Sequence, residues 1–475
     1  MGRLQQHLTQ IQSRQGAVLN WNLPEDNLHV ARAALVGSAT AVDKSPTERF
    51  AHLADLVLSR GQNLHHPHYV GHQVPASIPL AGLFDALGAV TNQVMAVYEM
   101  GPFVTAIEKS LVEQLGLRVG WTPGSFAGLA THGGSIANLT ALLTARNVAL
   151  GDVWERGVGS ASGQPVLLTG ADSHYSIARA AGVLGLGTQQ VIRVGLDDRR
   201  RMDARELDRL LTELAAAGRP VIAVAASCCA TPVGAFDPLV DVAAVCQKHR
   251  VWLHVDAAHG GAALFSARQR GLLAGIDQAD SVVWDAHKML FVPALCAFVL
   301  YRNREQRFEA FRQHAPYLFD PAAPGGADFD LGTQTLECTK RAAVLGLWGV
   351  WSMFGPDLFG DLVDLTFDLA AHFHGLLQAQ PDFQALHEPQ CNIVAFRYLP
   401  AELHDAAPAL IGDFQRALRR HVIESGDFYL VPVQIEGIGA LRVTLINPLT
   451  TRDDLQDLLA ALRRHGEAVL ATLPH

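Results

Sequence analysis

The sequence predicts an α/β fold with a mostly parallel sheet covered by helices. Short, continuous apolar runs recur between residues 95 and 297, at 166–168, 191–194, 221–224, 251–253 and 281–283. Helical patterns separate most of these runs, for example Leu207, Leu210, Leu211 and Leu214. Apolar runs without polar alternation are typical of strands that are buried on both faces, as in parallel sheets.

Composition and charge restrict the class of protein. With 475 residues, of which 49% are hydrophobic and 17% charged, the chain can bury a large core and is expected to form two or three domains. A net charge of −9 argues against a nucleic-acid partner. No apolar stretch is long enough to span a membrane, and residues 1–20 lack the apolar segment of a signal peptide. Six cysteines without a C-x-x-C pair favour reduced thiols, so we expect a cytoplasmic protein without a membrane partner.

Three segments follow one another along the chain. Residues 1–94 are predicted to form an N-terminal helical arm, in which Pro46 opens a helix. Residues 95–345 are predicted to form the large α/β domain. Residues 346–475 have an α+β pattern of their own and are predicted to form a small C-terminal domain. Its expected strands are 393–398, 428–433 and 441–446.

Two polar residues follow the ends of apolar runs. Asp256 comes after the run 251–253, and Lys288 comes after the run 281–283. Ligands of parallel α/β sheets bind at the carboxyl ends of the strands, so we expect both side chains at one site. A lysine there is a candidate for Schiff-base chemistry, although an exposed surface lysine is the common alternative. An aspartate that keeps a pyridine nitrogen protonated, together with a lysine that holds an aldehyde, is the minimal equipment for pyridoxal phosphate.

Two further motifs lie in the same half of the chain. The segment 131–138 contains Gly133 and Gly134 and precedes a helical pattern, so its backbone amides are candidates for holding a phosphate, although glycines before a helix are also ordinary turns. The segment 173–176 opens another helix, and His174 there is a candidate either for stacking on an aromatic cofactor or for capping the helix.

Histidines also raise the alternative of a metal-dependent hydrolase. His254, Asp256 and His259 have suitable spacing for such a site, and four more histidines lie between residues 65 and 72. The spacing of these four histidines matches no standard zinc pattern, and we expect no metal.

The Pro- and Gly-rich segment 316–328 is predicted to be a lid.

From about Pro67 to Pro448 the sequence resembles the group II pyridoxal-phosphate-dependent amino-acid decarboxylases, the family of the glutamate, cysteine-sulfinate and aromatic amino-acid decarboxylases. The segments that carry the resemblance are 254–258, the pair His287-Lys288, 234–238 and 442–448. The resemblance implies the fold of the type I pyridoxal-phosphate-dependent transferases, with a seven-stranded, mostly parallel sheet, and a homodimer whose active sites are shared across the interface.

The resemblance also implies roles for individual residues. Lys288 would form the internal aldimine, and Asp256 would pair with the pyridinium nitrogen. Tyr317 would be the lid residue that protonates the substrate carbanion. The other expected cofactor contacts are Gly134, Ser135 and His287 at the phosphate, Thr231 near Asp256 or the ring hydroxyl, and Ala258 and His174 on the two ring faces. Arg442 would lie near the substrate carboxylate, and we expect His72, Gln73, His259 and Phe103 to line the side-chain pocket.

The expected reaction is decarboxylation of an L-amino acid to an amine and CO2. The substrate is expected to be acidic (glutamate, aspartate or cysteine sulfinate) or diaminobutyrate. An aminotransferase or a carbonyl-forming oxidative decarboxylase would use the same Lys288 and Asp256, and Tyr317 favours decarboxylation. Three sites depart from the family pattern: Asp285-Ala286 replaces Asn-Pro, His259 replaces an aromatic residue, and the segment 230–232 (Ala-Thr-Pro) replaces Gly-Thr-Thr.

Overall fold

A computed structural model describes residues 2–36, 44–311 and 328–472. The chain divides into two compact units, and each is described by itself. The larger unit consists of residues 73–367 and 389–391. The smaller unit consists of residues 1–72, 368–388 and 392–475. The expected boundaries at 94/95 and 345/346 stay a prediction. No helix among the described residues is long and apolar enough to cross a membrane.

The larger unit contains a seven-stranded sheet in the order β1-β7-β6-β5-β4-β2-β3. Neighbouring strands from β6 to β3 run parallel, whereas β7 runs antiparallel to both β1 and β6. The strands are β1 (Ala127–Thr131), β2 (Val166–Gly170), β3 (Val191–Val194), β4 (Val221–Ser227), β5 (Leu253–Asp256), β6 (Ser281–Asp285) and β7 (Ala297–Tyr301). The predicted mostly parallel, seven-stranded sheet is therefore confirmed, although β5 begins two residues later than the run at Val251 suggested.

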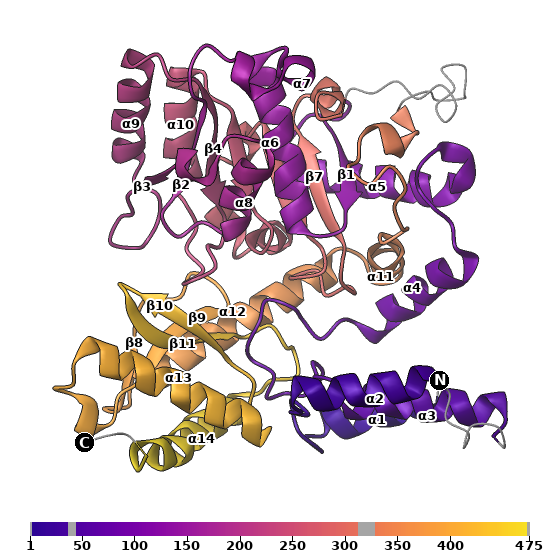
Figure 1. Cartoon of the computed structure of the whole chain (residues 1–475), viewed down its shortest axis with the longest axis vertical. Helices are drawn as coiled ribbons and strands as arrows, with labels where there is room; N and C mark the ends of the chain where they lie inside the picture. Colours follow the sequence, from indigo (N-terminus) through magenta and orange to yellow (C-terminus); the bar gives the residue numbers. More distant parts are fainter. Residues whose placement is uncertain (1, 37–43, 312–327, 473–475) are drawn as a thin grey trace. The chain divides into compact units, whose positions relative to one another are not determined.

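Helices cover this sheet (Figure 1). Its main helices are α4 (Pro79–Thr91), α5 (Pro102–Val119), α6 (Gly134–Leu150), α8 (Tyr175–Val183), α9 (Ala204–Ala216), α10 (Leu239–His249) and α11 (Leu345–Phe354). Helix α6 packs on β4, β6 and β7, and its Ala141 and Leu142 are fully buried with Val283 and Val299 of the sheet. Because α6 lies on the central strands, its first turn is held at the edge where the parallel strands end.

A buried ion pair fixes the end of β1. The Lys340 ammonium lies 2.6 Å from Glu108 Oε1 and donates to the carbonyl of Ala130 at 2.6 Å. The amide of Ala130 donates to the same Glu108 oxygen at 2.9 Å. Both charged side chains are 1% exposed. The pair therefore joins α5, β1 and the segment before α11 without contact with water.

The smaller unit contains a four-stranded antiparallel sheet in the order β10-β11-β9-β8. Its strands are β8 (Phe383–Ala385), β9 (Ile393–Tyr398), β10 (Val431–Ile435) and β11 (Ile438–Thr444). Strands β10 and β11 form a hairpin whose two turn residues, Glu436 and Gly437, have φ of 54° and 76°. Positive φ at both positions is typical of a type I′ turn, which ends β10 at Ile435 and pairs it with Ile438. Strand β10 begins at Val431 and not at Phe428 as predicted.

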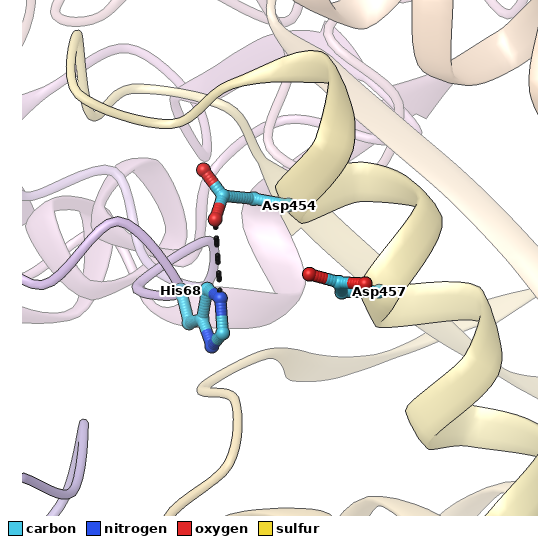
Figure 2. A group of neighbouring side chains, drawn as sticks. All are labelled: His68, Asp454 and Asp457. Atoms are coloured by element: carbon cyan, nitrogen blue, oxygen red, sulfur yellow. Dashed lines mark hydrogen bonds and ion pairs between the residues drawn. The ribbon is translucent and has the colours of Figure 1, made fainter.

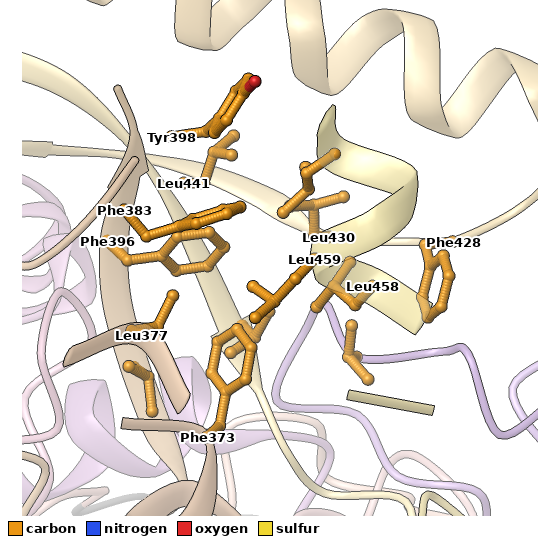
Figure 3. Packing of buried hydrophobic residues seen from close by; sticks show 14 of the residues in the cluster. Phe373, Leu377, Phe383, Phe396, Tyr398, Phe428, Leu430, Leu441, Leu458 and Leu459 are labelled. Carbon is orange, nitrogen blue, oxygen red and sulfur yellow. The ribbon is translucent and has the colours of Figure 1, made fainter. Parts of the chain in front are cut away.

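One aromatic core holds the smaller unit together (Figure 3). Phe373 and Phe396 meet edge to face at 5.4 Å between ring centroids, and both are fully buried. The helices around this core are α13 (Pro408–Ser425), α14 (Arg452–Leu470) and residues 368–378 of α12 (Asp357–Gln378). Leu458 and Leu459 of α14 contribute to the core, as their helical spacing suggests.

The N-terminal helices belong to the smaller unit. They are α1 (Gly2–Gln12), α2 (Pro24–Val36) and α3 (Pro46–Ser59). Helix α3 begins at Pro46, as predicted, and Ser45 and Glu48 form a reciprocal capping box there. Phe50 and Val57 of α3 are each 74% exposed, so the apolar face of this helix is not covered within the described chain.

Candidate active site

The carboxyl ends of the parallel strands enclose a cavity of about 380 Å³. Asp256 is the last residue of β5, and Lys288 follows the neighbouring strand β6. The cavity is lined by Gln73, His132, Gly133, Gly134, Ser135, Asn138, His174, Ser227, Cys228, Cys229, Ala230, Thr231, Asp256, Ala258, His259, Asp285, His287, Lys288 and Leu295. All the residues predicted to hold the cofactor are therefore brought together.

A larger cavity, of about 580 Å³, lies at helices α1 and α3 of the smaller unit. Its lining includes Arg3 and Asp55, which form an ion pair with each other at 2.5 Å. None of the residues predicted for chemistry lines this cavity, so we assign the active site to the smaller cavity of the larger unit.

A chain of hydrogen bonds orients Asp256. Its Oδ2 accepts from Asn138 Nδ2 at 2.8 Å, and its Oδ1 accepts from the amide of Ala258 at 3.1 Å. Asn138 Oδ1 lies 2.9 Å from His254 Nε2, and His254 Nδ1 lies 2.9 Å from Ser281 Oγ. Burial lowers the pKa of His254 to about 4, so its ring is neutral and its Nε2–H donates to Asn138. The carboxylate of Asp256 is thus held in one orientation, with its charge available to a ligand.

These contacts exclude the expected alternative role of His254. Its side chain is fully buried, and both ring nitrogens are engaged by Asn138 and Ser281. A metal ligand needs a free nitrogen lone pair that points at the ion. His254 therefore supports Asp256 and cannot form a hydrolase site with it.

His174 caps a helix, one of the two roles expected from the sequence, and stacking on a cofactor stays a prediction. It is the N-cap of α8, where its Nδ1 accepts from the amide of Ser176 at 3.3 Å, and its side chain lines the cavity. Burial lowers the pKa of His174, so the ring is neutral near pH 7. A neutral imidazole held by its own helix cap provides a flat, fixed surface for an aromatic ring.

The glycine-containing turn lies at the start of α6. Gly133 has a φ of 105°, which only glycine adopts without strain, and Gly134 is the first residue of the helix. A Cβ at Gly134 would lie 2.8 Å and 2.9 Å from the two carboxylate oxygens of Asp285. The free amides of this first helical turn are suited to an anion such as a phosphate.

Lys288 and His287 both lie near the carboxylate of Asp285. Its Nζ is 3.2 Å from Asp285 Oδ2. His287 Nδ1 donates to the carbonyl of Cys296 at 2.8 Å, which leaves its Nε2 3.7 Å from the same Asp285 oxygen. Asp285 Oδ1 is buried and has no hydrogen-bond partner among the described residues.

The donor set fits a phosphorylated pyridine aldehyde. It combines a lysine amine, an oriented carboxylate, a neutral imidazole surface and a helix N-terminus in one cavity. Each of these groups matches one part of pyridoxal phosphate: the aldehyde, the ring nitrogen, the ring face and the phosphate. Fold and site together define a pyridoxal-phosphate-dependent enzyme of fold type I.

Comparison with known proteins narrows this class. Residues 48–399 match the family described as the pyridoxal-dependent decarboxylase conserved domain. The acidic amino acid decarboxylase GADL1 of Mus musculus is 31% identical over 379 residues, which cover 78% of this chain and 68% of that protein. The GADL1 of Xenopus tropicalis is 28% identical over 431 residues, which cover 89% of this chain and 83% of that protein.

Solved structures agree in fold. Mouse CSAD matches with a TM-score of 0.87 at 27% identity, and the match covers 98% of both chains. Oryza sativa TDC with PLP and tryptamine matches with a TM-score of 0.86 at 20% identity, over 98% of this chain and 96% of that one. The chain belongs to the pyridoxal-dependent decarboxylase family and is therefore a carboxy-lyase that uses pyridoxal phosphate.

The other residues predicted for the site are Tyr317, His72, Arg442, Phe103, Gln73 and His259. Tyr317 falls outside the described residues. His72 and Arg442 belong to the smaller unit, where burial and then the charges of Arg442 and Arg419 lower the pKa of His72. Phe103 is 63% exposed on α5 and does not line the cavity, whereas Gln73 and His259 do.

Sequence reasoning missed three features of the cavity. Asn138 orients Asp256, and only its place in the first turns of α6 could have suggested this. His132 Nδ1 lies 2.9 Å from Glu337 Oε1, and this hydrogen bond lowers the pKa of Glu337. Cys229 Sγ lies 3.1 Å from Cys391 Sγ. No local signal connects residues so far apart in the sequence.

Proposed function

We propose that this enzyme decarboxylates an acidic L-amino acid to the corresponding amine and CO2, with Lys288 as the anchor of the cofactor. The observation that carries the proposal is the joint placement of Lys288 and the oriented Asp256 in one cavity at the strand ends. The choice of an acidic substrate is supported by the names of the curated relatives, which are acidic amino acid decarboxylases. Diaminobutyrate is the second candidate, because a neighbouring solved structure carries that name.

Each side chain has a defined task in this proposal. Pyridoxal phosphate, when bound, supplies an electrophilic aldehyde and a ring that withdraws electrons from the substrate α-carbon. Asp256 holds a proton on the ring nitrogen, and Asn138 keeps its carboxylate in that position. His174 and Ala258 would hold the two ring faces, and Thr231 would lie near Asp256 or the ring hydroxyl. Gly134, Ser135 and His287 would bind the phosphate.

The remaining tasks concern the substrate. Arg442 would bind its carboxylate, and His72 would line the side-chain pocket. Tyr317 would donate a proton to the substrate α-carbon after CO2 has left. A phenol suits this step because it delivers a proton without adding a charge that would hold the carboxylate. Tyr317→Phe should release CO2 but yield more carbonyl product relative to amine. If the ratio of amine to carbonyl product and the rate are both unchanged, a group other than Tyr317 donates the proton.

We further propose a cytoplasmic homodimer with shared active sites. The exposed apolar side chains of α3, among them Phe50 and Val57, support a second copy of the chain as their partner. Mixing Lys288→Ala subunits with Tyr317→Phe subunits should then restore one intact site in each heterodimer. A fully active monomer in light scattering would contradict this assembly.

The central experiment measures CO2 release from glutamate, aspartate, cysteine sulfinate and diaminobutyrate, together with the remaining standard amino acids. We expect an acidic substrate to be preferred, and Lys288→Ala to lose both turnover and the visible absorbance of the bound cofactor. Lys248→Ala is the matched control, because this lysine is exposed and pairs with Asp208. Wild-type turnover in Lys288→Ala would overturn the proposed anchor, and exclusive use of apolar amino acids would overturn the substrate class.

A further inference from the structure

Asp285 is a buried carboxylate that the roles proposed above do not use. Its side chain is 2% exposed, and it lies at the end of β6. Oδ2 faces Lys288 Nζ at 3.2 Å, while Oδ1 has no hydrogen-bond partner among the described residues. A buried carboxylate is costly unless its charge is compensated, so Lys288 is its principal counter-ion.

The surroundings of Asp285 contain few other charges. His287 Nε2 lies 3.7 Å away, and His174 at the start of α8 and Cys296 before β7 interact with it electrostatically. The carboxylate lies close to Gly134, the first residue of α6, because a Cβ there would be 2.8 Å and 2.9 Å from its two oxygens. Lys288 is in turn influenced by His174 and by Cys229, and Asp256 lines the same cavity.

This position has two electrostatic consequences. The carboxylate of Asp285, 3.2 Å from the Lys288 nitrogen, stabilises a positive charge on that nitrogen by Coulomb attraction. The same carboxylate packs on the helix turn that is suited to a phosphate, and a negative charge there weakens the attraction for a second anion. An asparagine at this position would be close to the aspartate in shape but would have no charge.

We propose that Asp285 is a positioning residue that keeps the nitrogen of Lys288 positively charged, both as the free amine and when joined to the cofactor aldehyde, and that it thereby weakens phosphate binding at the neighbouring turn. The proposal rests on the anchoring role of Lys288. It assigns to this chain a cofactor linkage that stays protonated to higher pH than it would with an asparagine. A positively charged linkage is the more electrophilic form and is ready for attack by the substrate amine.

The first test is a pH titration of the visible absorbance of the bound cofactor in the wild type and in Asp285→Asn. We expect the spectral transition of the variant to lie at least about one pH unit lower, because the carboxylate no longer favours the protonated nitrogen. Glu337→Gln is the matched control: it removes a carboxylate that pairs with the cavity residue His132 and makes no contact with Lys288. Its transition should stay at the wild-type pH.

The second test measures anion affinity without turnover. Apoenzyme is titrated with pyridoxal phosphate, and inorganic phosphate is used as a competitor. Asp285→Asn should bind both at least several-fold more tightly, whereas Glu337→Gln should not. Asp285→Ser, which is smaller, provides the same comparison if the asparagine variant fails to fold, as judged by circular dichroism.

The outcomes separate this inference from the proposed function. If Lys288→Ala keeps the visible cofactor band, the anchor is wrong and the inference fails with it. If Lys288→Ala loses the band but the uncharged variants of Asp285 titrate like the wild type, the anchor stands and the inference alone is overturned. Phosphate binding by Asp285→Asn and Asp285→Ser that is equal to or weaker than that of the wild type would also overturn the inference.

Discussion

Each unit of the molecule contains a carboxylate that is nearly inaccessible to solvent and lies among histidine and basic groups, but the two are satisfied very differently. In the smaller unit, His68, Asp454 and Asp457 come close enough to resemble a metal site (Figure 2). In the larger unit, Asp285 lies beside His287 and Lys288. Asp454 is fully bonded, whereas Asp285 leaves one oxygen without a hydrogen-bond partner among the described residues.

The bonds of Asp454 explain the difference. Arg14 donates to both of its oxygens at 2.7 Å, and the amide and hydroxyl of Thr451 donate to Oδ2 at 2.7 Å as the cap of α14. Burial alone would raise the pKa of Asp454, but these hydrogen bonds more than offset it and lower the pKa to about 2. Proximity of metal-ligating side chains is therefore a weaker indicator of a site than unsatisfied hydrogen-bonding capacity.

The largest effect is expected at the oriented carboxylate of the cavity. Asp256→Asn should retain the cofactor but lose at least three orders of magnitude in kcat/KM, about 4 kcal/mol of transition-state stabilisation, because a neutral pyridine withdraws electrons poorly. Asp172→Asn is the control, since Asp172 pairs with Arg200 and does not line the cavity. A rate of Asp256→Asn within a few-fold of the wild type would show that the charge of Asp256 is not needed for the reaction, although Asn138 orients this carboxylate.

The next largest effect is expected at the buried ion pair between Lys340 and Glu108. In this pair each charge has a partner of opposite sign, and no histidine is involved. Lys340→Met should lower the free energy of unfolding by roughly 3 kcal/mol, because it leaves Glu108 buried without its counter-ion. The double variant Glu108→Leu with Lys340→Met should recover most of this loss in urea unfolding experiments. Equal instability of the single and double variants would indicate that packing, and not the unpaired charge, dominates.

A smaller effect is expected at Asp454. Asp454→Asn should lower the free energy of unfolding near neutral pH by roughly 2 kcal/mol, since one pKa unit corresponds to ~1.4 kcal/mol. The carboxylate has a lowered pKa in the folded state, so its contribution is present above about pH 4 and is lost as the pH falls towards 2. The variant should therefore show a flatter dependence of stability on pH in this range, and an unchanged slope would contradict the assignment.

The smallest effect concerns metal. Zinc or a chelator should leave the thermal unfolding midpoint unchanged, because Arg14 and Thr451 already occupy the oxygens of Asp454. The control is the Arg14→Ala variant, in which both oxygens of Asp454 lose the hydrogen bond from Arg14. A zinc-dependent rise in the midpoint of the wild type would show that bonding of this kind does not exclude a metal.

The sequence predicted the features that local patterns encode. The apolar runs identified β2, β3, β4 and β6, and Pro46 marked the start of α3. Strand β1 has no such signal, because Gly128 must be small: a Cβ there would lie 2.6 Å from the carbonyl of Val299. Close approach between distant segments determines that residue, and a single sequence does not show which segments meet.

In the candidate site too, some residues could be predicted from local patterns and others could not. Asp256, Lys288 and the turn at Gly134 were predicted because each follows a strand or precedes a helix. Asn138 and Glu337 were missed, since their roles depend on contacts with Asp256 and His132 across the fold. Positions within elements are therefore encoded locally, whereas partners between elements are not.

The pairing of β1 with β7 has a consequence for how the enzyme is made. Ala127 at the start of β1 pairs with Tyr301 at the end of β7, and five other strands are synthesised in between. At about 5–20 residues per second, a ribosome needs on the order of 10 to 30 s to cover that distance. During this interval β1 lacks its partner strand, and the glycine turn that follows it has no fixed position. The turn at Gly133 and Gly134 can therefore reach its folded position only after β7 has left the ribosome.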